Sequence, residues 1–406
     1  MTSRFFGTWT ARLLAAAVPL CAALLVAGCD ADRYPDDLTY PLRSDPLIEP
    51  PTEPSAQPTS FDLPGDFPQT VLLGFQKLPD ASKVVIPTGK KLSGGDRAEL
   101  RQTLDKIFGT PAQPKVDGID DEAREALRLD NATLAKGSEL FRRNCLQCHG
   151  LTGDGRGHTA GWINPHPRDF RRGMFKFTSS SQSQGPARKA RRDDLLRTLR
   201  QGIEGTAMPS FGLLADDDLQ AIVSYVIHLS LRGECEAYAT FQRKEDQPVA
   251  ESVSDSLDSF VGFWRQTEQK VIKPPPYPIA DGNESARMAS VTRGFDFFAK
   301  NCLSCHENYG RKDVYKYDAW GTIVRPADLT LGIYRGGRRP IDLYWRIHAG
   351  INASQMPATV DSAMTAVQVW DVVNFVQSLP YRDRLPSEVR DQIYPPEAKE
   401  MARGSD

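Results

Sequence analysis

The sequence predicts an all-α protein in which two similar helical domains follow one another along the chain. One plan occurs twice, from about residue 134 to 230 and from about residue 291 to 379, and such internal similarity marks repeated structural units. Each copy closes with a helix of period 3.6. The apolar stripe of that helix comprises Leu219, Ile222, Val223 and Val226 in the first copy and Val369, Val372, Val373 and Val376 in the second. A chain of 406 residues is long enough to give both copies a buried core.

Before the first copy, the N-terminus has the pattern of an export signal. Arg4 and Arg12 precede an apolar run from Leu13 to Gly28, which ends in small residues directly before Cys29. The end of this run resembles a bacterial lipobox, which implies cleavage after Gly28 and a diacylglycerol on the Cys29 thiol. The alternative is an uncleaved membrane-spanning helix, which needs roughly 20 apolar residues, whereas this run has sixteen.

The lipobox resemblance also implies a location. In bacterial lipoproteins, an aspartate such as Asp30 directly after the cysteine favours retention at the inner membrane. Several acyl chains on one cysteine anchor firmly, because each buried CH₂ contributes about 0.8 kcal/mol. We therefore expect attachment to the cell inner membrane through a lipid anchor, with the protein facing the periplasm. The formal net charge of −2 and this exported location exclude nucleic acid as a partner.

The segment between the anchor and the first copy is rich in proline. Eleven prolines lie from Pro35 to Pro87, and proline fixes φ and removes a hydrogen-bond donor, so we expect an extended tether here. One short helix is predicted over 96–108, ended by Gly109-Thr110-Pro111. Another amphipathic helix is predicted between the copies, marked by Leu257, Phe260, Val261 and Trp264.

These features divide the chain into six parts. In order, they are a lipoprotein signal peptide at 1–28, a proline-rich tether with a short helix at 29–130, a first helical domain at 131–235, a linker with an amphipathic helix at 236–285, a second helical domain at 286–382 and a polar C-terminal tail at 383–406.

Each domain contains the pentapeptide C-x-x-C-H, at 145–149 and at 302–306. This motif is typical of c-type haem attachment. Two thiols one helical turn apart can form thioethers with the vinyl groups on one porphyrin edge, and the adjacent histidine then binds the iron from the proximal side. We therefore expect two covalently bound haem c groups, held by Cys145, Cys148 and His149 and by Cys302, Cys305 and His306.

Two other interpretations of C-x-x-C-H are weaker. Half a zinc site needs a second pair of Cys or His nearby, and neither domain supplies a second Cys pair. A thioredoxin-like dithiol needs a βαβ pattern, which is absent from the sequence. Export also favours haem, because c-type attachment takes place outside the cytoplasm.

A methionine recurs at one position of both domains. Met208 and Met356 each lie six residues after a glycine, Gly202 or Gly350, and directly before a proline. The proline favours an extended loop that can hold a sulfur over the porphyrin, and a His/Met pair raises the haem potential. We expect these methionines to be the second axial ligands. The histidines without a counterpart in the other copy are expected to be surface or core residues: His158, His166, His228 and His348.

At this point the sequence resembles the class I c-type cytochromes, in a tandem di-haem form. The resemblance implies a small helical fold in each domain, whose first and last helices cross where Gly137 meets Tyr225 and where Gly294 meets Phe375. The segments 167–170 and 325–329 also resemble the P-R-D-[FL] segment of bacterial multidomain cytochromes. The proline whose carbonyl usually holds the proximal histidine is missing from both domains, and His158 stands in its place in the first. The residues do not show which acceptor replaces it.

Basic residues provide a further expectation. Haem propionates bind arginine by bidentate hydrogen bonds, and the candidates are Arg168, Arg172, Arg325 and Arg338. The run 188–192 is expected to be a solvated loop, or else a docking patch for an acidic redox partner.

The leading hypothesis for function is electron transfer, since an iron closed on both faces by His and Met has no open site for substrate. The resemblance implies redox partners such as a quinol-oxidising complex, a terminal oxidase or a dehydrogenase. The alternative is a di-haem cytochrome c peroxidase-like enzyme, which needs one open haem and an acid/base residue above it. No residue pattern marks either haem as the open one.

Overall fold

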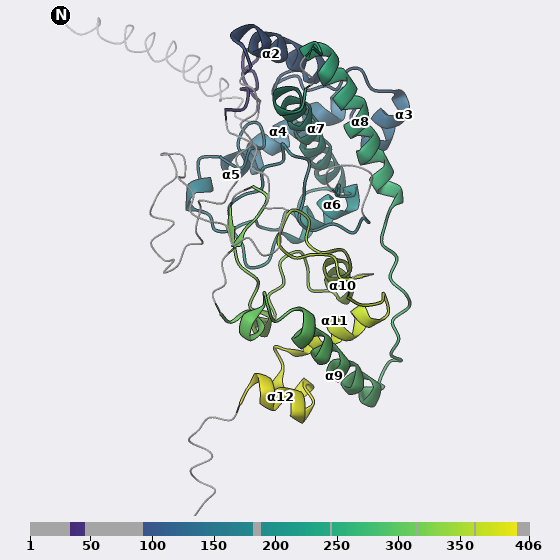
Figure 1. Cartoon of the computed structure of the whole chain (residues 1–406). Helices are drawn as coiled ribbons and strands as arrows, with labels where there is room; N and C mark the ends of the chain where they lie inside the picture. The colour runs from purple at the N-terminus through teal and green to yellow at the C-terminus, as the bar shows by residue number, and fades with distance from the viewer. Residues whose placement is uncertain are drawn as a thin grey trace, which may run out of the picture.

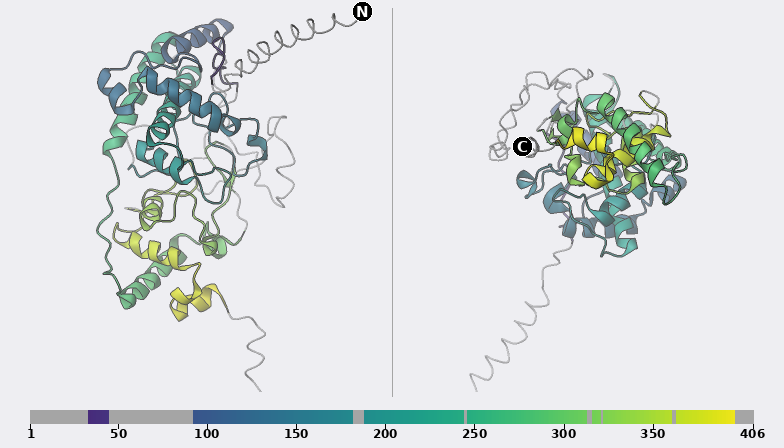
Figure 2. Two further views of the ribbon diagram at one scale, coloured as in Figure 1. Left: turned by 180° about the vertical axis from the view of Figure 1, so that it is seen from behind. Right: turned by 90° about the horizontal axis from the view of Figure 1, so that it is seen from below.

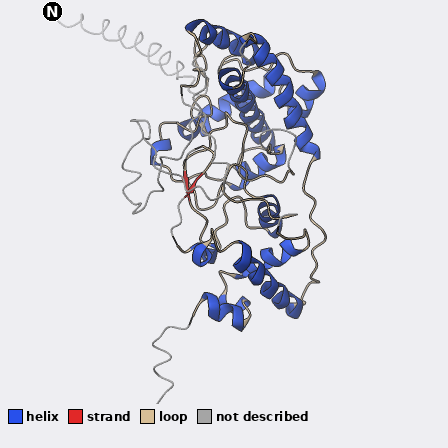
Figure 3. Cartoon of the chain, in the orientation of Figure 1, coloured by secondary structure: helices blue, strands red, loops and turns tan. Residues whose placement is uncertain are grey.

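The computed structural model describes residues 33–44, 92–181, 188–243, 246–312, 316–320, 322–360 and 363–395. Cys29 and the expected signal peptide lie outside these ranges. The described chain is helical, with one sheet of two short antiparallel strands, β1 (Lys316–Tyr317) and β2 (Ile323–Val324) (Figure 3). The all-α class predicted from the sequence is confirmed. No helix in these ranges is both long enough and apolar enough to cross a membrane.

Domain 1 is built on a crossing of two helices, α4 (Asn131–Asn144) and α7 (Asp216–Phe241) (Figure 1). The Asp130 side chain caps α4 by accepting from Thr133 N. At the crossing, a Cβ on Gly137 would lie 2.2 Å from the Ala221 carbonyl oxygen and 2.9 Å from Tyr225 Cβ. Only glycine allows this approach, so the predicted Gly137–Tyr225 contact is confirmed.

Domain 2 repeats the crossing with α9 (Glu284–Asn301) and α11 (Gln368–Ser378). A Cβ on Gly294 would lie 2.0 Å from the Asp371 carbonyl oxygen and 2.8 Å from Phe375 Cβ, which confirms the second predicted contact. Each domain also has a ten-residue helix before its methionine loop, α6 (Arg192–Gln201) or α10 (Pro340–Ala349).

Domain 1 has additional helices that domain 2 lacks. α2 (Gly94–Phe108), α3 (Asp121–Leu127) and α8 (Val249–Gln269) share one hydrophobic core with α4 and α7. The sequence predicts a proline-rich tether with a short helix at 29–130. That helix is α2, and because Leu100, Leu104 and Phe108 are buried in this core, α2 belongs to domain 1.

Part of the proline-rich segment also packs against domain 1. Tyr40 is fully buried, and its hydroxyl lies 2.8 Å from the Tyr225 hydroxyl on α7. The Arg232 guanidinium donates to the Tyr40 carbonyl at 3.3 Å. Residues 33–44 therefore form a packed arm on α7 rather than a free tether, because the aromatic rings between the prolines supply apolar surface to bury.

Domain 2 is smaller and less regular. Its remaining elements are the short helices η4 (Glu307–Gly310), η5 (Leu329–Leu331), η6 (Arg382–Arg384) and α12 (Ser387–Ile393). Val389 and Ile393 of α12 are buried in the core of domain 2, so part of the expected polar tail is folded. Domain 1 has the matching short pieces α5 (Leu146–His149) and η3 (Ala160–Trp162).

The two domains lie against each other, and a long extended segment after α8 runs along one side to reach α9 (Figures 1 and 2). Arg188 and Asn352 join them directly. Arg188 donates to the carbonyls of Ala349 at 2.6 Å and Gly350 at 3.0 Å, and the Asn352 amide donates to the Arg188 carbonyl at 2.6 Å. Arg188 is buried, so the start of the run 188–192 belongs to the domain interface and is not a docking patch.

Candidate functional site

A single cavity of about 430 Å³ lies between the two domains and receives side chains from both. Its walls are mostly apolar. Every residue that the sequence predicts to attach haem or to bind its iron lines this cavity: Cys145, Cys148, His149 and Met208 from domain 1, and Cys302, Cys305, His306 and Met356 from domain 2. The fold thus gathers two motifs that are more than 150 residues apart in sequence around one space.

In both domains the C-x-x-C-H motif forms a tight turn directly after the first helix. α4 ends at Cys145 and α9 at Cys302. The backbone N–H of His149 donates to the Cys145 carbonyl at 2.9 Å, and that of His306 to the Cys302 carbonyl at 2.8 Å. This one-turn geometry places both thiols and the imidazole on the same side, and all four motif cysteines are free of disulfides.

A backbone carbonyl holds the His149 ring through its Nδ1 atom. His149 Nδ1 lies 3.1 Å from the Arg168 carbonyl oxygen, in the P-R-D-F segment. A bond from Nδ1 leaves Nε2 to bind a metal. Burial lowers the pKa of His149 to about 4, so the imidazole is neutral at physiological pH and able to act as a ligand. Gly155 makes the segment's approach possible, because a Cβ there would lie 2.5 Å from the Pro167 carbonyl.

The equivalent histidine of domain 2 is held differently. The Ala327 carbonyl occupies the position of the Arg168 carbonyl, but His306 Nδ1 finds no partner with hydrogen-bond geometry in the described residues. Burial lowers the pKa of His306 to about 4 as well. The acceptors that the sequence did not reveal are therefore Arg168 and, less closely, Ala327, both in the segments that resemble P-R-D-[FL].

The two methionine loops have the same geometry. The N–H of Ile203 donates to the Met208 carbonyl at 3.1 Å, and the N–H of Ile351 donates to the Met356 carbonyl at the same distance. A hydroxyl two residues earlier accepts from each methionine N–H at 3.2 Å, Thr206 Oγ1 in domain 1 and Ser354 Oγ in domain 2. The structure therefore places both methionines on matching rigid loops in the cavity wall.

Two of the histidines that have no counterpart in the other copy lie in different surroundings, one in the core and one in the cavity wall. His228 is fully buried away from the cavity, and its Nε2 lies 2.9 Å from the Phe108 carbonyl. His166 does line the cavity, beside the proximal segment, and its Nδ1 lies 3.1 Å from the Pro167 carbonyl. No sequence signal marks the place of His166, because it has no counterpart in the second copy.

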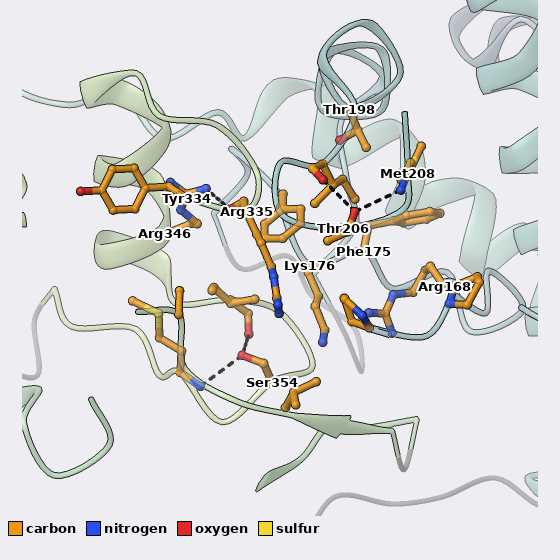
Figure 4. A pocket seen from close by; sticks show the side chains of 18 of the residues that line it. Arg168, Phe175, Lys176, Thr198, Thr206, Met208, Tyr334, Arg335, Arg346 and Ser354 are labelled. Atoms are coloured by element: carbon orange, nitrogen blue, oxygen red, sulfur yellow. Dashed lines mark hydrogen bonds between the residues drawn. The ribbon is translucent and has the colours of Figure 1, made fainter. Parts of the chain in front are cut away.

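The cavity is strongly cationic. Its lining contains six Lys and Arg side chains and, among the described residues, no Asp or Glu: Arg168, Lys176, Lys316, Arg325, Arg335 and Arg346. Figure 4 shows Arg168, Lys176 and Arg335 extending into the space between Thr206 of domain 1 and Ser354 of domain 2. Of the predicted propionate ligands, Arg168 and Arg325 line the cavity. Arg172 instead donates to the Ala319 carbonyl, and Arg338 pairs with Glu204 outside it.

Comparison with family models agrees with this arrangement. Residues 132–226 match the model of cytochrome c oxidase, cbb3-type, subunit III, and residues 291–380 match the model of cytochrome c. Each match covers one C-x-x-C-H motif and its methionine loop. The chain is a tandem di-haem c-type cytochrome. It carries two covalently bound haem c groups.

One solved structure is similar to this cytochrome. A chain from the Kuenenia stuttgartiensis reducing HAO-like protein complex has 22% sequence identity, covers 60% of the present chain and 95% of its own length, and gives a TM-score of 0.45. No curated protein matches the sequence.

The cavity fits the two haems of this di-haem cytochrome on chemical grounds. Porphyrin rings need apolar walls, and each haem brings two propionates that need cationic partners. Asp318 pairs with Arg168 and Lys176, but no carboxylate of the described residues lines the cavity itself, so its six cations favour the binding of anions there. The thiols, imidazoles and thioethers on its wall are the groups that attach and ligate haem c.

Proposed function

We propose that this cytochrome relays electrons from a donor to an acceptor through two haems that share one cavity between its domains. Cys145 and Cys148 attach the first haem, with His149 and Met208 as axial ligands, and Cys302 and Cys305 attach the second, with His306 and Met356. The observation that carries the proposal is that both ligand sets line one continuous cavity. Bound haem supplies one-electron chemistry by alternation of its iron between the ferric and ferrous states.

The chain's own residues keep both irons closed to substrate. The turns at Cys145 and Cys302 fix the imidazoles, and the matching loops at Met208 and Met356 place a methionine of each domain in the cavity wall, where it would serve as the second iron ligand. Apolar walls exclude water, and Arg168, Lys176 and Arg335 balance the propionates. A haem held by these ligand pairs would change its oxidation state with little movement of the protein.

The proposed location and partners rest on sequence features. A lipid anchor on Cys29 would attach the protein to the inner membrane, facing the periplasm, and the packed arm at 33–44 would hold domain 1 near the start of the tether. The partners in this proposal are redox proteins, namely a quinol-oxidising complex or a dehydrogenase as donor and a terminal oxidase as acceptor. The name of the family model matched by domain 1, an oxidase subunit, supports the last of these.

The test is a visible spectrum of the purified ferric protein with haem quantified per chain. We expect two haems per chain, both low-spin, with the weak iron–methionine sulfur band in the far red. Met208→Ala and Met356→Ala should each remove the low-spin signature of one haem. A high-spin haem in the unmodified protein would contradict the relay and favour the peroxidase-like alternative, which a peroxide turnover assay would then decide.

A further inference from the structure

A short segment of domain 2 reaches the proximal side of the haem site in domain 1. This segment, residues 318–320, directly follows strand β1. The Trp320 ring lies over the Arg168 guanidinium, with 3.5 Å between the guanidinium carbon and the ring centroid. Its indole Nε1–H also donates to the Asp169 carbonyl at 3.1 Å. One side chain of domain 2 thus contacts two consecutive residues of the P-R-D-F segment of domain 1.

Asp318 strengthens the same contact. Its carboxylate has no exposed surface and lies 3.7 Å from the Arg168 guanidinium and 2.8 Å from Lys176 Nζ. Burial alone would raise the pKa of Asp318, but Lys176 and Arg168 together lower it, so the carboxylate stays charged. Thr322 Oγ1 donates to it at 2.8 Å. Arg168 is therefore held by an aromatic face on one side and a fixed anion on another.

The backbone of Arg168 has a separate role, because its carbonyl is the acceptor for His149 Nδ1. We propose that Trp320 and Asp318 are positioning residues that fix this carbonyl from across the domain interface and so set the reduction potential of the haem in domain 1. The proposal rests on the function proposed above, in which His149 is an iron ligand. Neither Trp320 nor Asp318 lines the cavity, so both act through Arg168.

The direction of the effect follows from ligand chemistry. A hydrogen bond from the far nitrogen of a ligating histidine makes the imidazole a more basic ligand. A more basic ligand stabilises ferric iron and lowers the potential. A weaker bond to the Arg168 carbonyl should therefore raise the potential of this haem. The effect is expected in domain 1 alone, because the carbonyl at the equivalent position of domain 2 belongs to Ala327, which has no long side chain for domain 1 to hold.

The experiment compares Trp320→Ala and Trp320→Phe with the control Trp345→Ala in the full-length holoprotein. Trp345 also crosses the interface, with its ring 5.0 Å from the Arg197 guanidinium and its Nε1–H donating to the Ile272 carbonyl at 3.1 Å, and neither partner belongs to the P-R-D-F segment. Tryptophan is neutral, so its replacement leaves the charges around the haems unchanged, which a change at Asp318 would not. Trp320→Phe keeps a smaller aromatic face for Arg168 and removes the Nε1–H donor.

The readout is a redox titration in which the two haems appear as two waves. The wave of the domain 1 haem is the one that Met208→His moves to lower potential, since a nitrogen ligand in place of sulfur lowers it. We expect Trp320→Ala to raise this wave by at most about fivefold in the equilibrium constant, or about 40 mV for one electron, which is the effect of losing the whole hydrogen bond. Trp320→Phe should give a smaller rise, and Trp345→Ala should give none.

Three outcomes would overturn the inference. They are an unchanged domain 1 wave, an equal rise with Trp345→Ala, and a fall in potential, which is the signature of water entering the site rather than of a weaker proximal bond. If Trp320→Ala does not fold, the potential measured for Trp320→Phe decides whether the inference holds. Failure of the proposed function is distinguishable from these, because it would appear as a high-spin spectrum or a missing second wave in the unmodified protein.

Discussion

The two domains share one plan for holding haem but differ in what supports it. The helix that closes the repeated plan is α7 in domain 1, with 26 residues, and α11 in domain 2, with 11. In domain 1, α2, α3, α8 and the arm at 33–44 add a core that lies away from the cavity. In domain 2, the core lies close to the cavity and its other supports are short helices. The comparison indicates that domain 1 has its own source of stability, whereas domain 2 depends on its cofactor.

The largest expected effect is therefore removal of one haem at a time. We expect Cys302→Ser with Cys305→Ser to leave domain 2 without a cooperative fold, because the apolar cavity wall would lose what it packs against. The matched pair Cys145→Ser with Cys148→Ser should leave α2, α7 and α8 packed. Hydrogen–deuterium exchange measures this directly, with protection expected to vanish in α9 and α11 in the first case and to persist in α7 and α8 in the second.

Equal protection of the two domains after haem loss would show that the added helices of domain 1 do not stabilise it independently. The haem content of each variant, measured from the pyridine haemochrome, must fall by half for the comparison to be valid. The unmodified chain serves as the reference for both pairs.

A second prediction concerns the added helices themselves. Trp264 of α8 is fully buried, and its Nε1–H donates at 3.2 Å to Glu234 on α7, which also pairs with the buried Lys189. Trp264→Ala should destabilise domain 1 by about 3–5 kcal/mol, measured as the free energy of unfolding in denaturant. Domain 2 should unfold at the same denaturant concentration as before. A shift of both transitions would mean that the domains unfold as one unit.

Sequence alone predicted the parts of this molecule that repeat. The two C-x-x-C-H motifs, the methionines six residues after a glycine and the Gly137 and Gly294 crossings each occur twice, and the crossings are confirmed by the structure. Recurrence is informative because a residue needed for one cofactor is needed again for the second.

The parts that occur once were harder to predict. The packing of α2, of the arm around Tyr40 and of α12 depends on distant partners that no local pattern names. The merging of two haem sites into one cavity depends on how the domains dock. The run 188–192 is predicted from its composition to be a solvated loop or a docking patch, and no sequence pattern marks Trp320, because the roles of Arg188 and Trp320 exist only across the two domains.

A third prediction uses the acid sensitivity of domain 1. Burial lowers the pKa of His228 to about 4, whereas an unfolded chain titrates near 6.5. Between these values only the unfolded state takes up the proton, so stability falls as the pH falls from about 6.5 to about 4, by about 3 kcal/mol in total. Domain 2 has Gln377 at this position. His228→Gln should therefore remove this part of the pH dependence, as measured by denaturant unfolding at pH 7 and pH 4.5.

The smallest expected effect is a difference in potential between the two haems of the unmodified protein. His149 has a proximal hydrogen bond at 3.1 Å, and His306 has none with good geometry in the described chain. One hydrogen bond contributes about 1 kcal/mol, which for one electron is about 40 mV, so we expect the domain 1 haem to have the lower potential. Electrons would then pass downhill from domain 1 to domain 2. A redox titration tests this once Met208→His has identified one wave. The reverse order of the two potentials would mean that the charges around the haems, including those of Lys176 and Arg335 in the shared cavity, have a larger effect than the proximal hydrogen bond.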